Sequence, residues 1–475
     1  MSNPLILGTN SIKDTGYDVA NSLRFNGADS EDLERTPSSS GNNNKNTVSV
    51  WLKRARVDEE DFIIYGEDGS TNRCKITFKS NNQLQVTTIV SSSNNLVYET
   101  NRLFRDTSAW YHFVFAFDST LSTSGDRCRV YVNGTEEDSF AVETDMGQNT
   151  SNTLSTSGKT VYIGSQNSGN FFDGYMAEFV FIDGQQLDPT SFGEFDSDSP
   201  NIWKPIDVSG LTFGTNGFYL DFENASSLGA DVSGNGNNFT VQNLTSVDQS
   251  TDTCTNNFCT FNSLVNVPYS TYSEGNLFVD VTSTGNSSHH TNYGNIAFSS
   301  GKWYWEAKAL GGTKYTIGLS DANNQSNYQQ VAGTNLIVGN HANSYISGDA
   351  IGYYFDAIYK NGSSVASSLH TIVTNDIMMV AVDADNGKIY FGVNGTWRVA
   401  NSTTFDPAQN DTTFTTGEFY VSAFSNEDCD WSVNWGSPAY SISSGNSDAE
   451  GFGNFEYPVP SGYFALCTKN LSEYG

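Results

Sequence analysis

The stretch GKWYWEAKAL, residues 301–310, places Trp303, Tyr304 and Trp305 side by side in a chain that is otherwise rich in Ser, Thr and Asn. Three adjacent aromatic residues can form a platform for stacking sugars, or they can lie in a strand buried on both faces. In a strand, alternation sends Trp303 and Trp305 to one face of the sheet and Tyr304 to the other. The motif WSVNWG at 431–436 would supply two more Trp to the same core. The pattern therefore favours a core strand over a sugar-binding platform.

The composition of the 475-residue chain favours an all-β protein. Aromatic residues make up 13% of the chain, more than disordered chains contain, so the chain can build cores. It holds 43 Gly and only 16% charged residues. Its aromatic and β-branched residues are the types that are enriched in strands. At this length we expect more than one domain.

The net charge of −30, from 23 Lys and Arg against 53 Asp and Glu, limits the partners. An acidic surface repels phosphate backbones and anionic lipid headgroups, so we expect neither nucleic-acid binding nor membrane insertion. Neutral glycans and divalent cations fit this charge better. The N-terminal stretch has no basic start and no long apolar run, so we expect neither a signal peptide nor a transmembrane helix.

Short segments that alternate large apolar and polar residues recur along the chain, as half-buried strands do. Asn-Gly pairs follow several of them, and both residues of that pair tolerate the positive φ of tight hairpin turns. The order buried strand, Asp, turn, strand, Asn-Gly-Thr occurs twice and predicts two β-sandwich (jelly-roll) modules. Between them, residues 205–260 carry the Gly- and Asn-rich turn DVSGNGNNFT, and we expect this segment to form a short β bridge.

The first module, residues 23–204, resembles a laminin-G-like, concanavalin A-like sandwich. The resemblance rests on the motifs VSVWLKR (48–54), WYHFVFAFD (110–118), RVYVNGTEE (129–137), VYIGSQ (161–166) and FFDGYMAEFVFIDGQQLDP (171–189). Such sandwiches often bind calcium at a rim, through Asp side chains and backbone carbonyls. The resemblance therefore makes Asp118, after a central strand, and Asp173, before the last long strand, the candidate calcium ligands. A solvated turn carboxylate is the alternative for each, and no other cofactor is expected.

The second module, residues 261–475, resembles a SPRY domain. The resemblance rests on GKWYWEAKA (301–309), YTIGLSD (315–321), IGYYFD (351–356), MMVAVDADNGKIYFGVNGTW (378–397), FYVSAFS (419–425), WSVNWG (431–436) and GYFALC (462–467). The module departs from that pattern in long Asn- and Ser-rich insertions. Rigid sandwiches commonly carry their binding sites in loops, so we take Tyr328, in the loop 320–335, and Trp397 as the aromatic candidates for ligand binding.

No catalytic motif stands out, and we predict a non-enzymatic protein. The nearest approach to the carboxylate set of a glycosidase is EFDSDS, with Glu194, Asp196 and Asp198, but the third acid is wrongly placed and the stretch lacks the aliphatic residues of a buried strand. The six Cys contain no C-x-x-C pair, so a zinc site is not expected. Cys254 and Cys259 flank a turn-like stretch and form either a disulfide or two buried thiols.

Taken together, the two modules and the bridge resemble structural proteins of tailed bacteriophages, especially marine ones. The resemblance implies a tail fibre or other virion appendage, exposed on the extracellular particle and assembled in the host cytoplasm, that binds host-surface glycan or protein. Its partners would be other virion proteins, docked through residues 1–22, and further copies of itself, with a trimer as the first expectation. The alternatives are a capsid decoration or tail-structural protein without receptor binding, and a polysaccharide-degrading enzyme.

Overall fold

The structure is a computed structural model. It describes residues 6, 16–69, 71–167, 169–265, 267, 269–282, 290–312, 314–324, 338–339, 348–399, 401–427 and 429–475. The chain divides into two compact units. We call residues 15–255 the first unit, and residues 256–475 together with 1–14 the second unit. In the described residues nearly all regular structure is strand, which confirms the all-β fold class.

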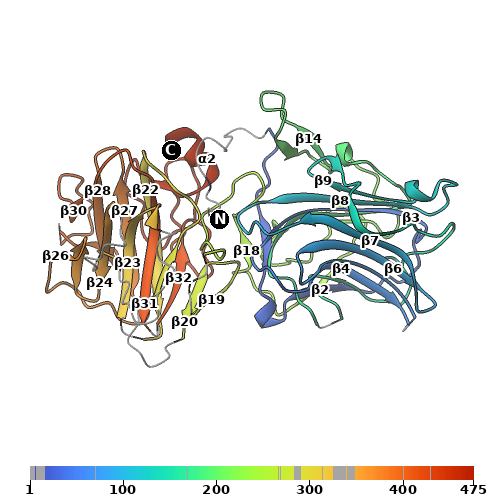
Figure 1. Ribbon diagram of the computed structural model, residues 1–475, viewed down its shortest axis with the longest axis horizontal. Helices are drawn as coiled ribbons and strands as arrows, with labels where there is room; N and C mark the ends of the chain where they lie inside the picture. Colours follow the sequence, from blue (N-terminus) through green and yellow to red (C-terminus); the bar gives the residue numbers. More distant parts are fainter. Residues whose placement is uncertain are drawn as a thin grey trace. The chain divides into compact units, whose positions relative to one another are not determined.

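The first unit is a sandwich of two antiparallel sheets (Figure 1). Its strands are β1 (Ser22–Phe25), β2 (Asp32–Arg35), β3 (Lys45–Arg54), β4 (Asp61–Asp68), β5 (Asn72–Phe78), β6 (Gln83–Val90), β7 (Ser93–Leu103), β8 (Tyr111–Asp118), β9 (Cys128–Val132), β10 (Thr135–Glu136), β11 (Phe140–Thr144), β12 (Val161–Ile163), β13 (Gly174–Asp183), β14 (Gly193–Phe195), β15 (Trp203–Pro205), β16 (Phe218–Leu220), β17 (Thr240–Gln242) and β18 (Gln249–Ser250), with 3-10 turns at Gly27–Asp29, Ser124–Asp126 and Pro189–Ser191. One sheet has the order β10-β9-β8-β3-β13-β1-β18, with β16 also on β13, and the other has the order β11-β7-β6-β5-β4-β12-β2-β17.

The segment 205–260, which the sequence predicts as a bridge, supplies strands to both sheets of the first unit up to residue 255. β16 pairs with β13, β17 pairs with β2, and β18 pairs with β1. Phe218, Leu220 and Phe239 from this segment lie in the main core of the sandwich. These added strands cover backbone groups that β1 and β2 would otherwise expose as sheet edges.

The sheet that contains β3 is buried on both faces. Its inner face carries residues such as Val50 and Phe115 into the main core. Its outer face lies under a second apolar layer, in which Trp51 and Ala177 pack with Trp203. Residues on both faces of β3 and β13 are therefore buried along nearly the whole length of each strand, polar ones included.

The second unit is also formed by two main antiparallel sheets. Its described elements are β19 (Ser270–Ser273), β20 (Phe278–Val281), β21 (His290–Tyr293), β22 (Lys302–Leu310), β23 (Lys314–Asp321), β24 (Ala350–Tyr354), β25 (Ala357–Lys360), β26 (Ser363–Ala366), β27 (Ile377–Asp383), β28 (Lys388–Val393), β29 (Thr396–Trp397), β30 (Thr412–Thr413), β31 (Tyr420–Glu427), β32 (Asp430–Asn434), β33 (Phe464–Ala465) and the helix α2 (Thr468–Tyr474). The sheet orders are β19-β20-β32-β22-β27-β28-β29, with β30 on β28 and β33 on β22, and β21-β31-β23-β24-β25-β26.

The aromatic triplet of β22 lies in the core of the second unit, as its alternation predicts. Trp303 and Trp305 are fully buried in the main core together with Trp431. Tyr304 points to the opposite face, where its ring packs against Phe455 at a centroid distance of 5.0 Å. The interpretation of this stretch as a core strand is therefore confirmed.

Most of the proposed docking segment 1–22 lies outside the described residues. Ile6 forms a parallel bridge with Ile296 of the second unit, and residues from 16 onward belong to the first unit. All six cysteines lie in the described part of the chain and are present as thiols, so Cys254 and Cys259 form no disulfide. Among the described helices none is long and apolar enough to cross a membrane.

Candidate functional site

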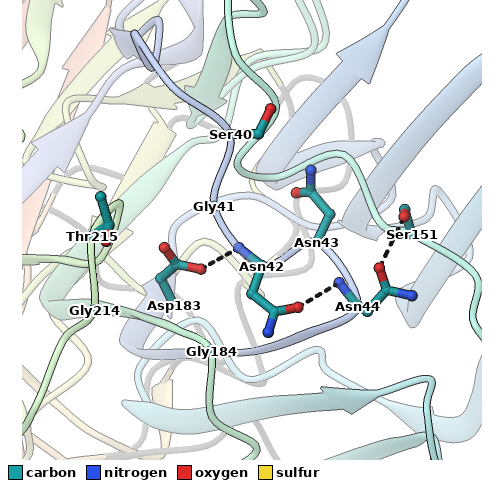
Figure 2. Close-up of a pocket in the computed structure, with 10 residues that line it drawn as sticks. All are labelled: Ser40, Gly41, Asn42, Asn43, Asn44, Ser151, Asp183, Gly184, Gly214 and Thr215. Atoms are coloured by element: carbon teal, nitrogen blue, oxygen red, sulfur yellow. Dashed lines mark hydrogen bonds between the residues drawn. The ribbon is translucent and has the colours of Figure 1, made fainter.

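An open polar pocket lies at one end of the first unit, where four loops converge (Figure 2). Its volume is about 580 Å³, within the range of ligand-binding pockets. Its lining comes from the loop before β3, the loop around Ser151, the end of β13 and the loop before β16. The lining residues are Ser40, Gly41, Asn42, Asn43, Asn44, Ser151, Asp183, Gly184, Gly214 and Thr215. We call this cavity the rim pocket.

Asp183, the last residue of β13, holds two walls of the rim pocket together. Its Oδ1 accepts a hydrogen bond from the backbone N–H of Asn42 at 2.6 Å, and its Oδ2 accepts one from the backbone N–H of Asn216 at 2.9 Å. Its own N–H donates to the carbonyl of Phe213 at 2.7 Å. The side chain is thus fixed before any ligand arrives, which lowers the entropic cost of binding.

The run of three Asn in the loop before β3 forms a self-supporting turn. The Oδ1 of Asn42 accepts from the backbone N–H groups of Asn44 and Lys45 at 3.2 and 3.1 Å, which is the hydrogen-bond pattern of an Asx turn. Asn43 accepts from the N–H and hydroxyl of Ser155, and Asn44 accepts from the hydroxyl of Ser151 at 3.1 Å. The turn therefore ties this loop to the loop that contains residues 151–155.

Gly214 allows the loop before β16, the last wall of the rim pocket, to approach Asp183 closely. Gly214 has φ +78°, in the left-handed region, and a Cβ placed on it would lie 2.0 Å from the carbonyl oxygen of Asp183. Only a residue without a side chain fits this position. The loop before β16 can therefore reach Asp183 and present Thr215 to the pocket.

Three groups of the rim pocket remain available to a ligand. Two of the roughly four lone-pair positions of the Asp183 carboxylate are taken by the two backbone donors, so it can accept further hydrogen bonds. The Nδ2 of Asn42 and the hydroxyl of Thr215 have no hydrogen-bond partner among the described residues. An acceptor, an amide donor and a hydroxyl are the groups that recognise sugar hydroxyls. None of the ten lining residues is aromatic, so the pocket offers no ring for stacking.

Asp118 lies beside the rim pocket, but its carboxylate is already engaged. Its Oδ2 contacts the ammonium of Lys45 at 2.6 Å, and its Oδ1 accepts from the N–H and the hydroxyl of Thr120. Burial opposes ionisation, but these hydrogen bonds from Lys45 and Thr120 hold the pKa of Asp118 below its ordinary value. A protein cation therefore stands where the sequence places calcium.

Asp173 lies at the other end of the same sheet. β3 pairs with β8 at Lys45 and with the start of β13 at Arg54, so the two candidate calcium ligands are roughly 30 Å apart along the strand. Asp173 is buried. Burial opposes the charge of Arg56, but Asp61, with a smaller contribution from Asp173, raises the pKa of that guanidinium. The two carboxylates do not form one site, and the described residues contain no group of three or more His, Cys, Asp and Glu that could hold a metal ion.

Of the two aromatic candidates, Trp397 lies in a core and Tyr328 lies outside the described residues. Trp397 is only 5% exposed, and its ring packs edge-on against Phe405 at 4.9 Å. It therefore presents no face for a ligand, and its expected binding role is corrected to a structural one. The hairpin NGTW bends back on β28, which buries the ring.

The EFDSDS stretch contains no pair of carboxylates suited to glycoside hydrolysis. Glu194 and Asp196 both face the ammonium of Lys204, at 3.5 and 3.2 Å, in the β14–β15 hairpin. The backbone N–H of Ser199 and the Lys204 ammonium lower the pKa of Asp196, whereas a general acid needs a raised pKa. Asp196 is therefore not suited to the role of a glycosidase's general acid.

The contact between His112 and Ser49 is also structural. The Nδ1 of His112 accepts from the indole N–H of Trp203 at 3.0 Å, so the other ring nitrogen carries the proton in the neutral imidazole. That nitrogen lies 2.8 Å from the Ser49 hydroxyl and must donate to it. Burial lowers the pKa of His112 to about 3, so the ring is neutral. A histidine that donates to the serine cannot act as its general base.

One family model matches most of the first unit. Residues 26–187, about a third of the chain, match the family model described as the concanavalin A-like lectin/glucanases superfamily. The sequence-based expectation of a concanavalin A-like first module is confirmed over these residues. No curated protein sequence matches the chain.

Solved structures resemble parts of the chain at low identity. A heptameric SAP-like pentraxin from Limulus polyphemus is 17% identical over 36% of this chain and 80% of its own, with a TM-score of 0.27. The SPRY domain of human HERC1 is 15% identical over 33% of this chain and 86% of its own, with a TM-score of 0.22. A putative carbohydrate binding protein from Bacteroides ovatus is 15% identical over 48% of this chain and 59% of its own, with a TM-score of 0.34. At these values none of them bears on what this chain binds, and the comparisons give no support to a bacteriophage origin.

Proposed function

We propose that the chain is a non-enzymatic glycan-binding protein and that the rim pocket is its binding site. The observation that carries the proposal is the fixed polar constellation of Asp183, Asn42 and Thr215 at the rim of a concanavalin A-like sandwich. The scaffold is rigid, because the walls of the pocket are joined by hydrogen bonds before a ligand is present. Rigid elements that carry polar loops are the usual way in which sandwiches present a binding site.

The charge of the site favours neutral ligands. Among the described residues that line the rim pocket, Asp183 is the only ionisable one, and the whole chain carries a net charge of −30. An anionic sugar would meet a carboxylate in the pocket and a repulsive field around it. The hydroxyls of a neutral sugar can donate to Asp183 and accept from the amide of Asn42.

The absence of a stacking ring in the lining implies weak binding by a single site. Hydrogen bonds to sugar hydroxyls replace hydrogen bonds to water, so each adds only about 0.5–1.5 kcal/mol. Several copies that bind together would raise the effective affinity. This supports a homo-oligomer, for which we propose a trimer. Light scattering of the purified chain measures its mass and tests that number directly.

On the particle, we propose that the chain serves as a tail fibre or other virion appendage that binds host-surface glycan or protein. Support comes from the resemblance of its two modules and bridge to phage structural proteins, with the docking of residues 1–22 to a virion partner as a further part of that proposal. Immunogold electron microscopy on intact particles is the test. We expect label at the tail or fibre tips. Label spread over the head would instead assign a decoration role, and no label on particles would remove the virion proposal.

A further inference from the structure

A second polar pocket adjoins the rim pocket in the first unit, with a volume of about 460 Å³. The Gly- and Asn-rich turn DVSGNGNNFT supplies four of its lining residues, from Gly236 to Thr240, and the end of β2 supplies Glu34 and Arg35. We call this cavity the turn pocket. The motif that the sequence marks as a bridge turn therefore lines a cavity.

One thin wall separates the two pockets. The segment 36–44 lines the turn pocket with Thr36 and Ser38 and then lines the rim pocket from Ser40 onward. Between them, the carbonyl of Ser39 accepts from the side-chain amide of Asn216 at 2.9 Å. On the other side, the amide of Asn237 donates to the carbonyl of Thr215 at 3.0 Å. Residues of both pockets are thus directly hydrogen-bonded to each other.

The wall is built from groups whose own hydrogen bonds are satisfied. Asn216 is only 3% exposed, and its Oδ1 accepts from the guanidinium of Arg35 at 3.1 Å. Arg35 also donates to the side-chain carbonyl of Asn237. Arg35 thus positions both Asn side chains of the wall, and it also lines the turn pocket.

Both pockets offer a carboxylate, a side-chain amide and a hydroxyl, although the turn pocket also presents Arg35 and its Glu34 already accepts from the side-chain amide of Gln242 at 3.2 Å. The rim pocket presents the carboxylate of Asp183, the amide nitrogen of Asn42 and the hydroxyl of Thr215. The turn pocket presents Glu34, Asn238 and Thr240 in these three roles. The Oδ1 of Asn238 accepts a hydrogen bond from the backbone N–H of Asp231. The Nδ2 of Asn238 and the hydroxyl of Thr240 have no hydrogen-bond partner among the described residues. A repeated set of groups suits a ligand that repeats its own chemistry.

We infer that the rim pocket and the turn pocket are neighbouring subsites for successive units of one neutral oligosaccharide. The inference rests on the proposed function and deepens it, because it names the ligand class as a chain of uncharged sugars. A single sugar would occupy one pocket and use half of the available groups. A longer chain would cross the wall formed by Ser39 and Asn216 and use both. Uronic acid chains are disfavoured at the rim pocket, because its described lining presents the carboxylate of Asp183 and no cation.

The test is calorimetric titration of the full chain with neutral gluco-, manno- and galacto-oligosaccharides of one to six units, and with oligogalacturonates. For at least one neutral series we expect affinity to rise about tenfold between the monosaccharide and the length that reaches both pockets, and then to level off, since two net hydrogen bonds give about that gain. We expect no rise with oligogalacturonates. A rise with oligogalacturonates alone would overturn the assignment to neutral sugars.

Two variants, each of which blocks one pocket, test whether both pockets are needed for the rise in affinity with chain length. Thr240→Trp fills the turn pocket and Thr215→Trp fills the rim pocket, and both positions are exposed, so the fold should tolerate them. We expect each variant to lose the tenfold rise with chain length. Thr135→Trp, at an exposed edge-strand position of the same unit, is the control and should keep the rise. Unchanged circular dichroism checks that the variants fold.

The outcomes separate the two proposals. Binding that is the same for every chain length, or a rise that survives in Thr240→Trp, would overturn the two-subsite inference while leaving the glycan-binding proposal intact. A wild-type chain that binds none of these sugars at any length would remove the support for the proposed function as well.

Discussion

The carboxylate of Asp183 accepts a hydrogen bond from the backbone N–H of Asn42 at 2.6 Å, across 141 positions of the sequence. Its second oxygen accepts from the backbone N–H of Asn216. One side chain at the end of a core strand thus sets the positions of two loops. The rim pocket exists because β13 ends in an acid at this point.

Removal of that carboxylate should loosen both loops. In Asp183→Ala the two backbone donors lose their acceptor, and we expect the free energy of unfolding to fall by about 1–3 kcal/mol. Asp183→Asn keeps one acceptor oxygen and should lose less. Urea unfolding measures both. Asp207→Asn, an exposed turn residue, is the control, and an equal loss in all three variants would contradict a special role for Asp183.

A second buried carboxylate makes stability depend on pH. Glu178 lies at an irregularity of β13, with φ 50° and a side chain that accepts from the hydroxyl of Tyr219 at 2.7 Å. Burial raises the pKa of Glu178 to about 7, helped by the charge of Asp221 and opposed by the hydrogen bond from Tyr219. In the unfolded chain a Glu has a pKa of about 4.3.

Because its folded pKa is raised, Glu178 stabilises the fold fully below about pH 4.3, and this contribution is lost as the pH rises through about 7. We expect wild type to lose roughly 4 kcal/mol relative to Glu178→Gln across that window. Urea unfolding of both proteins between pH 4 and 8 gives the difference. A constant difference at every pH would show that Glu178 titrates alike in both states.

Trp397 should matter for stability and not for ligand binding. Its ring fills a core with Phe405 and Tyr304 in the second unit, so Trp397→Ala should cost about 3–5 kcal/mol. Phe419→Ala, at a 45% exposed ring in the same unit, should change stability by less than about 0.5 kcal/mol. If Trp397→Ala left the unfolding transition in place but abolished binding, the ring would have the ligand role after all.

Calcium at Asp118 or Asp173 can be tested by chelation. Lys45 and Arg56 stand beside these two carboxylates, so we expect the melting temperature to be the same with EDTA and with millimolar calcium. A ligand that binds only the folded chain raises its stability with concentration. A calcium-dependent rise that disappears in Asp118→Asn or Asp173→Asn would establish the site that the resemblance implies.

The non-enzymatic proposal predicts no release of reducing sugar from neutral polysaccharides or host envelope. The carboxylates of Glu194 and Asp196 face Lys204, and the lowered pKa of Asp196 does not suit a general acid. A reducing-sugar assay with wild type, Glu194→Gln and Asp196→Asn is the check. Release by the wild type that both variants lose would make this hairpin catalytic and would overturn the proposal.

Local patterns in the sequence predicted much of the fold. Alternation in the stretch 301–310 placed Trp303 and Trp305 on one face of the sheet and Tyr304 on the other, because successive side chains of a strand point to opposite faces. The structure has them in two separate cores. The same logic identified β3, β8 and β13 of the first unit. The pairing of β17 and β18 with β2 and β1 was not predicted, because short strands of two or three residues carry too little pattern to reveal a partner some 200 residues away.

The candidate site was harder to predict than the fold. Four loops from distant parts of the chain form the rim pocket, and no local motif shows that Asn42 and Asp183 meet. The run of Asn at 42–44 and the acid at the end of β13 are the only signals that the sequence offered. Trp397 was a candidate because it is aromatic. The hairpin that carries it packs the ring inward against Phe405 and Tyr304, and the local sequence does not reveal these contacts.

Equilibrium binding of the full chain to an array of purified neutral glycans, with Asp183→Ala compared at equal concentration, tests whether the rim pocket binds glycan. We expect the wild type to bind at least one neutral glycan and the folded variant to bind it at least tenfold more weakly. Equal binding by the variant, or no binding by the wild type, would contradict the assignment of the rim pocket as a glycan site.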